Sequence, residues 1–291
     1  MKIGIHGKEF NRQLVPMMEK IFLCLQQHHA KLFISTKFER FLKSPAFKKF
    51  TWQTYEPGKS LKKLDVLLSI GGDGTLLESV THIGAHETPI LGINTGRLGF
   101  LATISKEEVE ASLTKIFQGA YTLDKRSVLR LESNNKLFGK LNFALNDFTL
   151  MKKDTSSMIT VHTYIDGVLL NSYWADGIIV STPTGSTGYA LSCGGPLVFP
   201  RSGNFVITPV SPHNLTVRPI VVSDDSEISF EVEGRSKNFL VSLDSRMAII
   251  NSTIKLKVVK EKFKVNLILP EGEHYFKTLR QKLNWGLDIR N

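Results

Sequence analysis

The 291-residue sequence contains only two cysteines, Cys24 and Cys193. Without a Cys-x-x-Cys spacing, two cysteines exclude a disulfide framework and a thiolate metal cluster. The sequence also lacks a run of about 18 consecutive apolar residues, which excludes a transmembrane helix. Its first residues have neither the apolar core nor the small-residue cleavage site of a secretory signal. We therefore expect a cytoplasmic protein with no membrane partner.

Acidic residues are fewer than basic ones, and 37 Lys and Arg against 27 Asp and Glu give a formal net charge of +10. A charge of this sign suits nucleic acid, an anionic membrane surface or a small polyanionic substrate. The lysines between Lys255 and Lys264 alternate with apolar residues, as on the solvated face of one strand. Such lysines mainly prevent strand-to-strand aggregation. Because no basic motif interleaved with aromatic residues is present, we expect no nucleic-acid partner.

The remaining composition, 42% apolar and 22% charged, is that of a globular protein and excludes a mostly disordered chain. Up to about residue 104, short strands alternate with helices. Leu64–Ile70 and Pro89–Asn94 are continuous apolar runs, typical of strands buried on both faces of a parallel sheet. Lys2–His6 and Lys31–Ser35 flank an amphipathic helix over Arg12–His29. These patterns predict an α/β N-terminal domain with a parallel, Rossmann-like sheet.

From residue 105 onward the pattern changes. Ser105–Glu108 is a capping box, which predicts a helix that ends near Phe117. Short alternating strands follow, including a hairpin in which Asp166-Gly167 joins Met158–Ile165 to Val168–Leu170. We therefore predict a predominantly β C-terminal domain.

The last residues return to a helical pattern. Glu273–Trp285 places Phe276, Leu279 and Leu283 on one stripe, so we expect this helix to pack back on the first domain. The predicted domains are residues 1–104 with 270–291, which carry the sequence GGDGT, and the β-rich residues 105–269.

A glycine-rich segment follows the predicted strand Leu64–Ile70 and opens a helix. Gly71, Gly72, Gly74 and Thr75 surround Asp73, and the glycines leave phosphate oxygens free access to the backbone amides at the helix start. No Gly-Lys-Ser/Thr follows, so the segment is not a P-loop, and it is not Gly-x-Gly-x-x-Gly either. An Asp-Gly turn without function is the alternative interpretation. The position after a buried parallel strand favours a phosphate-binding site.

Two further segments carry polar groups near predicted strands. The first is a run of hydroxyls and glycines over Ser181–Tyr189, which a strand beginning near Asp176 delivers; such groups bind sugar hydroxyls and phosphates without a buried charge. A polar surface loop is the alternative. The second is the pair Asn146-Asp147, which offers donor and acceptor together and suits a ribose diol or the edge of a base. As an isolated dipeptide this pair is more typical of a turn.

Taken in order, these segments resemble the NAD kinases. The resemblance is carried by GGDGTLL, NTGRLGFL at 94–101, Asn146-Asp147, DGxxxSTPTGSTGYALS from Asp176, ITPVSPHNLTVRPIVV at 207–222 and FKTLRQKLNWG near the end. It spans nearly the whole chain. GGDGT alone is shared with phosphofructokinases and with diacylglycerol and sphingosine kinases, whereas STPTGSTGYALS is more particular to NAD kinases.

The resemblance implies a kinase that transfers the γ-phosphoryl group of ATP to the 2′-hydroxyl of the adenosine ribose of NAD, making NADP. Asp73 is implied as the catalytic base that accepts the hydroxyl proton. Mg²⁺ or another divalent cation is expected to arrive with ATP, because no metal-ligand spacing is present in the sequence. A homodimer or homotetramer is also implied.

The residues implied to bind NAD are Asp73, Gly74, Asn146, Asp147, Trp174, Asp176, Thr187, Gly188, Tyr189, Ala190, Leu191, Ser192 and Arg246. The phosphate loop would consist of Gly71, Gly72, Gly74 and Thr75. Three positions depart from the commoner family pattern: Gly188 stands where Ala is frequent, Trp174 where Arg often occurs, and Arg246 where Gln is usual. The departures put the roles of positions 174 and 246 in doubt and leave Asp73 untouched.

Two other functions are open. A lipid kinase of the diacylglycerol type shares the GGDGT element, but it needs an apolar acceptor pocket, which the hydroxyl-rich segment Ser181–Ser192 disfavours. A non-catalytic nucleotide-sensing module is the second alternative, and Asp73 between glycines speaks against it.

Overall fold

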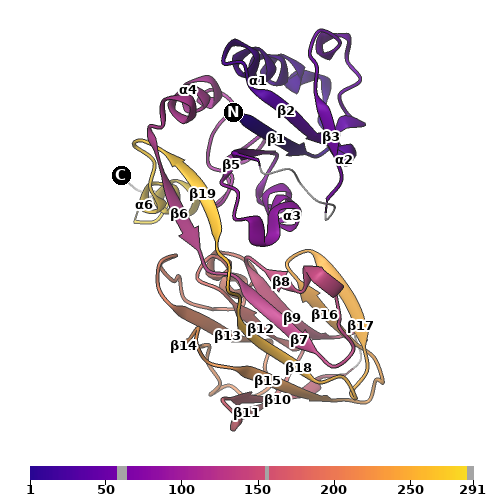
Figure 1. Ribbon diagram of the computed structural model, residues 1–291. Helices are drawn as coiled ribbons and strands as arrows, with labels where there is room; N and C mark the ends of the chain where they lie inside the picture. Colours follow the sequence, from indigo (N-terminus) through magenta and orange to yellow (C-terminus); the bar gives the residue numbers. More distant parts are fainter. Residues whose placement is uncertain (58–63, 155–156, 287–291) are drawn as a thin grey trace. The chain divides into compact units, whose positions relative to one another are not determined.

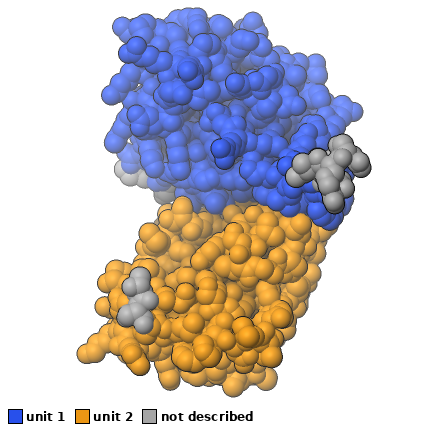
Figure 2. Space-filling view, turned by 180° about the vertical axis from the view of Figure 1, so that it is seen from behind, with its two compact units in different colours: residues 1–125, 265–291 blue, residues 126–264 orange. Residues whose placement is uncertain are grey.

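The structure is a computed structural model that describes residues 1–57, 64–154 and 157–286 (Figure 1). It forms two compact units: unit 1 comprises residues 1–125 and 265–291, and unit 2 comprises residues 126–264 (Figure 2). Unit 2 is thus one continuous segment inserted into unit 1. Among the described residues, no helix has both the length and the apolar character that crossing a bilayer requires.

The unit boundaries differ from the predicted ones, 104/105 and 269/270. Helix α4 (Val109–Gln118) and strands β6 (Tyr121–Arg126) and β19 (Val265–Pro270) extend the first unit. Both strands belong to the sheet of unit 1, where they are neighbours, so the chain leaves and re-enters the unit along that sheet. The change from an α/β pattern to a β-rich pattern in the sequence therefore does not coincide with the residues at which the chain leaves and re-enters unit 1.

Unit 1 contains one seven-stranded sheet with the order β3-β2-β1-β4-β5-β19-β6. The strands not yet introduced are β1 (Lys2–Gly7), β2 (Lys31–Ser35), β3 (Gln53–Tyr55), β4 (Val66–Ile70) and β5 (Ile90–Ile93). The helices are α1 (Val15–Gln27), α2 (Thr36–Glu39), α3 (Asp73–Ile83), α4 and α6 (Tyr275–Leu283). The pairs β2–β3, β1–β2, β1–β4, β4–β5 and β5–β19 are parallel. The predicted α/β fold class is confirmed.

Helices cover both faces of this sheet. The apolar side chains of α1 and α4 share one core cluster with Ile5, Leu68 and Ile93. Helix α3 contacts β1, β4 and β5 on the other face, where a Cβ atom on Gly92 would lie 2.8 Å from Leu76 Cδ1. Every residue of β4 is buried, as predicted from its continuous apolar sequence.

The starts of two predicted helices are wrong in detail. The first helix begins at Val15, because Arg12–Leu14 form a 3-10 turn ahead of Pro16. Helix α4 begins at Val109 rather than beside Ser105: the Glu108 carboxylate accepts from Ser105 N at 3.1 Å, yet the intervening residues form a turn. The capping hydrogen bond is therefore present, and the helix follows it after one turn.

The C-terminal helix α6 belongs to unit 1, as expected, but its buried side is narrower than the predicted stripe. Leu279 is 4% exposed, whereas Phe276 and Leu283 are 49% and 37% exposed. Thr278 is the other buried residue of the helix. Residue spacing alone predicts which side of a helix is apolar. It does not show that a short helix at the edge of a unit buries only its central residues.

Unit 2 consists of two six-stranded sheets with the orders β11-β10-β15-β18-β7-β8 and β14-β13-β12-β9-β16-β17. The strands of the first sheet are β7 (Leu129–Ser133), β8 (Phe143–Ala144), β10 (Ile159–Ile165), β11 (Val168–Ala175), β15 (Ile228–Glu233) and β18 (Leu256–Lys260). Those of the second are β9 (Asp147–Lys152), β12 (Gly177–Ser181), β13 (Asn204–Val210), β14 (Ile220–Ser223), β16 (Phe239–Leu243) and β17 (Arg246–Ile250). Side chains from both sheets share one core, which includes Phe148, Ile178, Phe205 and Phe230.

The predicted hairpin is confirmed: β10 and β11 pair antiparallel around Asp166 and Gly167, whose φ angles are 50° and 80°. On β18, Lys257 lies 2.9 Å from Glu227, and Lys260 lies 2.8 Å from Asp224. These lysines are therefore paired with acids of their own unit.

Candidate active site

The glycine-rich segment lies where the order of strands in unit 1 reverses. Strand β1 is flanked by β2 on one side and β4 on the other, and Gly7 at the end of β1 is paired with Ile70 at the end of β4. Both carboxyl ends therefore open at the same sheet edge, which is where open α/β sheets bind ligands. The segment 71–75 begins immediately after β4.

The start of helix α3 leaves backbone amides accessible. Gly72 is its N-cap residue, and both Gly72 and Gly74 are exposed. The first amides of a helix have no acceptor within the helix, and the helix dipole adds positive potential there. Gly71 has a φ of +153°, and a Cβ atom there would lie 2.2 Å from Thr75 Oγ1. The segment can thus hold an anion such as phosphate.

The Asp73 carboxylate accepts hydrogen bonds from three backbone amides of the segment that follows β5. Oδ2 accepts from Phe100 N at 2.8 Å, and Oδ1 accepts from Leu101 N and Ala102 N, both at 3.0 Å. Asn94 braces the same segment, because its Nδ2 donates to Arg97 O at 2.6 Å. The sequence singled out both segments but not the contact between them.

This arrangement leaves one acceptor position on Asp73. A carboxylate has about four lone-pair positions, two on each oxygen. Oδ1 uses both of its positions on backbone amides, whereas Oδ2 uses one. Asp73 is half-buried, so the remaining position on Oδ2 can accept a proton or hydrogen bond from a ligand hydroxyl.

Glycine at position 99 makes the close approach to Asp73 possible. A Cβ atom there would lie 1.9 Å from Asp73 Oδ1, well inside any contact that atoms tolerate. The neighbouring Gly96 has nothing within 4 Å of its Cβ position. A side chain at position 99 would therefore collide with Asp73, whereas position 96 has room for one.

Lys8 is a site residue that the sequence analysis missed. It follows β1 directly and is exposed, and a Cβ atom on Gly74 would lie 3.7 Å from its Nζ. A cation beside the start of α3 increases the attraction of this edge for phosphate groups. Its position directly after β1, the neighbour of β4 in the sheet, is the feature of the sequence that could have identified it.

In unit 2, the pair Asn146-Asp147 follows β8 closely, and Asp147 is the first residue of β9. The chain crosses there from β8 in one sheet to β9 in the other. Asp244, in the turn between β16 and β17, accepts from the backbone N atoms of Leu145, Asn146 and Asp147 at 3.0, 2.8 and 3.2 Å. This buried carboxylate fixes the crossing, and it is a second residue that the sequence analysis missed.

Both side chains of the pair keep acceptors for a ligand. Asn146 Oδ1 is buried without a hydrogen-bond partner. Burial, together with the charge of Asp244, raises the pKa of Asp147 to about 7. Burial also raises the pKa of Asp244, but three backbone amides and Arg246 oppose that effect. The pKa values of both members of this acidic pair are therefore raised above their usual range.

Three hydroxyls of the segment Ser181–Thr187 donate to backbone carbonyl oxygens. The Oγ1 atom of Thr182 donates to Leu145 O at 2.6 Å, and Ser186 Oγ donates to Pro183 O at 2.7 Å. Thr187 Oγ1 donates to Thr184 O at 3.0 Å. These three hydroxyls can still accept hydrogen bonds from a ligand, although their donors are used.

Gly188 and Tyr189 lie beside the Asn146-Asp147 pair. A Cβ atom on Gly188 would lie 3.6 Å from Asn146 Nδ2 and 3.7 Å from Asp147 Oδ2. Tyr189 begins the short helix α5 (Tyr189–Ser192) and is 41% exposed. Burial, and then the charges of Cys193, Asp176 and Asp147, raise the pKa of its phenol. The structure thus brings together four of the predicted residues, with Asp176 close by and paired to Lys152 at 2.6 Å.

Three predicted residues have other surroundings. Trp174 is 51% exposed and packs its ring against His213, with centroids 4.3 Å apart. The Arg246 guanidinium donates to the carbonyl oxygens of Leu141 and Phe143 and lies over the Phe143 ring. Ala190 is fully buried beside Ile179 and Val210.

The other members of α5 differ in exposure: Leu191 is partly exposed and Ser192 is exposed. A cavity of about 370 Å³ in unit 2 is lined by residues that include Tyr164, Phe230 and Lys257. None of the predicted site residues lines this cavity, so it is separate from the residues of the sequence motifs.

Comparison with known proteins gives consistent matches. The family model of the ATP-NAD kinase N-terminal domain matches residues 3–121, and that of the ATP-NAD kinase C-terminal domain matches residues 145–269. The chain is 55% identical over 296 residues to an NAD kinase of Cytophaga hutchinsonii, and 46% identical over 294 residues to one of Flavobacterium psychrophilum. Both alignments cover 100% of each chain.

Two solved structures are similar to the chain. An NAD kinase from Archaeoglobus fulgidus in complex with ATP has a TM-score of 0.75 at 25% identity, covering 98% of this chain and 99% of that one. A yeast NADH kinase complexed with NADH has a TM-score of 0.88 at 20% identity, covering 100% of this chain and 89% of that one. At 20% identity, the similarity to the yeast NADH kinase shows a shared fold.

Proposed function

The chain belongs to the NAD kinase family, and from this premise we propose that it transfers the γ-phosphoryl group of ATP to the 2′-hydroxyl of the adenosine ribose of NAD, making NADP. The observation that carries the proposal is the Asp73 carboxylate at the start of α3. It keeps one acceptor position beside accessible helix amides, at the edge where β1 and β4 end.

Asp73 acts as the base. Its carboxylate orients the attacking 2′-hydroxyl and takes the proton as the bond to phosphorus forms. Phosphoryl transfer has a loose transition state, so positioning and charge neutralisation contribute more than the strength of the base. The three amides that hold the carboxylate support this role, because they fix its orientation before substrate binds.

The phosphate groups bind at the start of α3. Gly71, Gly72, Gly74 and Thr75 form the phosphate loop, and the exposed Lys8 adds positive charge beside it. Mg²⁺ or another divalent cation, held by the phosphate oxygens of ATP, would supply charge neutralisation there. The amides and the lysine at this edge fit the phosphate groups, and Asp73 is the carboxylate nearest to them.

Unit 2 supplies recognition of the dinucleotide. Asn146 Oδ1 and the Asp147 carboxyl group accept hydrogen bonds, and the exposed Tyr189 offers a ring for stacking. Asp176, Thr187, Gly188, Leu191 and Ser192 are the remaining predicted NAD-binding residues that this proposal keeps. Ala190 acts through its backbone, because its side chain is buried.

Trp174 and Arg246 are kept with narrower roles. Trp174 is exposed and contributes a surface for the ligand, whereas Arg246 positions the Asn146-Asp147 crossing through Asp244, from which it lies 3.8 Å away. The family resemblance also supports a homodimer or homotetramer, and two free cysteines support a cytoplasmic setting. The lipid kinase and sensing alternatives are not favoured by the full-length matches.

The test of the proposal is the variant Asp73→Asn, assayed by coupling NADP formation to an NADP-specific dehydrogenase. The amide keeps the acceptor for Leu101 and Ala102 but loses the bond to Phe100 and the site for the proton. We expect kcat to fall about 100-fold or more, with the NAD dissociation constant within a few-fold.

The matched control is Asp65→Asn, which also weakens one backbone hydrogen bond in unit 1, from Lys2 N at 2.7 Å. It should keep the kcat of the unchanged protein. A near-normal kcat for Asp73→Asn would show that Asp73 is not the base.

A further inference from the structure

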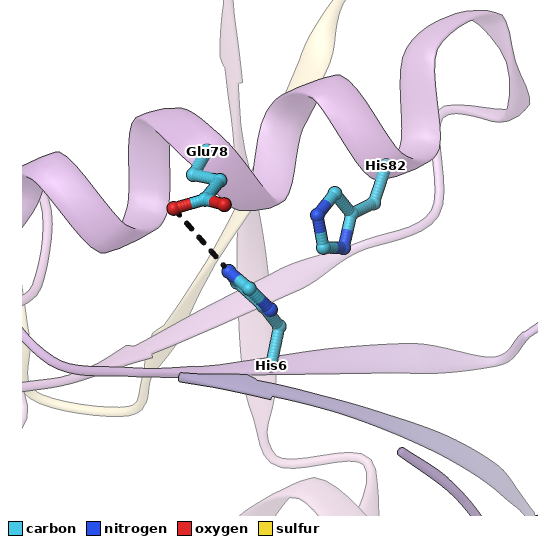
Figure 3. A group of neighbouring side chains, drawn as sticks. All are labelled: His6, Glu78 and His82. Atoms are coloured by element: carbon cyan, nitrogen blue, oxygen red, sulfur yellow. Dashed lines mark ion pairs between the residues drawn. The ribbon is translucent and has the colours of Figure 1, made fainter. Parts of the chain in front are cut away.

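Three side chains that the proposed reaction does not use meet between strand β1 and helix α3. His6 is the penultimate residue of β1, and Glu78 and His82 occupy one side of α3, four residues apart. One ligand atom from each lies within 4.8 Å of those of the other two. Figure 3 shows the Glu78 carboxylate and the His82 ring descending from the helix toward the His6 ring.

Both histidines are buried, and each has its Nδ1 atom held by a hydroxyl group. His6 is 0% exposed, with Nδ1 2.8 Å from Ser35 Oγ. His82 is 4% exposed, with Nδ1 3.1 Å from the Tyr55 hydroxyl. When these hydroxyls accept from Nδ1–H, the lone pair of each ring lies on Nε2. Outer hydrogen bonds of this kind orient histidine ligands in metal sites.

One buried nitrogen of this cluster has no hydrogen-bond partner. His6 Nε2 is buried and has no hydrogen-bond partner. Glu78 Oε2 lies 3.7 Å from it, too far for a hydrogen bond. Two ligands of a tetrahedral zinc ion, at about 2.0–2.1 Å from the metal, are about 3.4 Å apart. The separation of these two atoms therefore fits a shared metal better than a direct contact.

We propose that His6, Glu78 and His82 form a binding site for a divalent transition metal, with Zn²⁺ as the preferred ion. Two neutral imidazoles and one carboxylate are borderline-soft ligands that suit zinc. The Glu78 side chain is 24% exposed, so a water molecule can complete the tetrahedron from that side. Lys37 Nζ donates to Glu78 Oε1 at 2.6 Å and leaves Oε2 for the metal.

The metal has a positioning role. It connects β1, which leads to Lys8, with α3, whose first residue is Asp73. The site is separate from the phosphate loop and does not depend on the proposed kinase function. The site could not be recognised from residue spacing, because His6 lies on a different element from Glu78 and His82, far away along the chain.

Metal binding is tested on the untagged full-length protein after removal of metals with a chelator. Zinc retained after equilibrium dialysis is counted by elemental analysis, and Co²⁺ replaces Zn²⁺ to give the visible absorption of a tetrahedral site. We expect one metal per chain and a higher melting temperature with Zn²⁺. His6→Gln and His82→Gln should each weaken binding at least tenfold.

His86→Gln is the matched control, because His86 is an exposed histidine of the same unit, just beyond α3. It should bind metal like the unchanged protein. Glu78→Gln provides a further variant that keeps an acceptor for Lys37 while removing the charged ligand, and it should also lose the cobalt spectrum. No retained metal, or equal retention in the His6 and His82 variants and the His86 control, would overturn the proposal.

Discussion

At the scale of single residues, the acidic pair in unit 2 shows how burial raises the pKa values of carboxyl groups. Asp147 and Asp244 are both buried, and Asp244 receives three backbone N–H groups with Arg246 nearby. Asp147 has the Asp244 charge beside it, which together with burial raises its pKa to about 7. A group that changes its protonation near neutral pH is thereby placed next to Asn146.

The raised pKa of Asp147 gives a signed prediction for stability. Its unfolded pKa is near 3.8 and its folded pKa is about 7, so between these values the folded protein binds more protons than the unfolded chain. The stability that the protonated group contributes is complete below the unfolded pKa and is lost as the pH rises to about 7. The variant Asp147→Asn has no carboxyl group to ionise at this position, so it does not lose this stability as the pH rises.

We therefore expect the melting temperature of Asp147→Asn, relative to the unchanged protein, to be higher at about pH 8 than at about pH 5. Calorimetry at both pH values measures the difference. The exposed Asp225→Asn in the same unit is the control and should show a difference that does not change with pH. A pH-independent difference for Asp147→Asn would contradict the assignment.

Gly99 gives a second prediction at this scale. Gly99→Ala places a Cβ atom 1.9 Å from Asp73 Oδ1, so the carboxylate or the segment 99–102 has to move. We expect kcat to fall by about tenfold or more, because an error of about 1 Å in a catalytic group is costly. Gly96→Ala, with open space at its Cβ position, should leave kcat unchanged in the same NADP assay. Equal rates for both variants would mean that the Asp73 position is not critical.

The sequence was sufficient to identify the polar residues of these motifs but not their partners. Asp73 could be selected because three glycines and a buried strand surround it in the sequence. Its bonds to Phe100, Leu101 and Ala102 depend on how two loops meet, and local sequence carries no sign of that. The same reason explains why Asp244 was missed, since its amide partners lie almost a hundred residues earlier.

At the scale of elements, the tail helix α6 shows the limit of periodicity. Its spacing predicted three buried apolar residues, and only Leu279 of these is buried. Leu279→Ala should therefore lower the free energy of unfolding by about 2–4 kcal/mol, as for other buried leucines. Denaturant titration measures the change.

The matched control is Leu283→Ala on the same helix, where the leucine is 37% exposed. We expect a loss within about 0.5 kcal/mol. If the two variants lost equal stability, the predicted stripe would be buried as a whole, contrary to the structure.

Strands were more predictable than helix ends. The fully buried β4 and the hairpin of β10 and β11 match their patterns, because continuous apolar runs and Asp-Gly turns restrict the backbone locally. The start of α4 did not match, since the capping bond of Glu108 to Ser105 also forms in a simple turn.

At the scale of the whole molecule, the residues of unit 2 lie between β6 and β19 in the sequence, whereas these two strands are neighbours in the sheet of unit 1. The two sequence textures predicted two units of the right classes. They did not locate the crossings, because β6 continues the sheet of unit 1 with a sequence that alternates like the strands of unit 2. Fold class and family could thus be predicted from sequence, whereas the exact division of the chain required the pairing of strands.

The proposed transfer of phosphate from ATP to NAD can be measured directly. The full-length protein is incubated with NAD, ATP and Mg²⁺, each omitted in turn, and with vesicles that contain diacylglycerol as a competing acceptor. We expect NADP to form only when all three components are present, with no phosphate transferred to the lipid. No NADP in the complete mixture, or phosphate on the lipid instead, would contradict the proposed function.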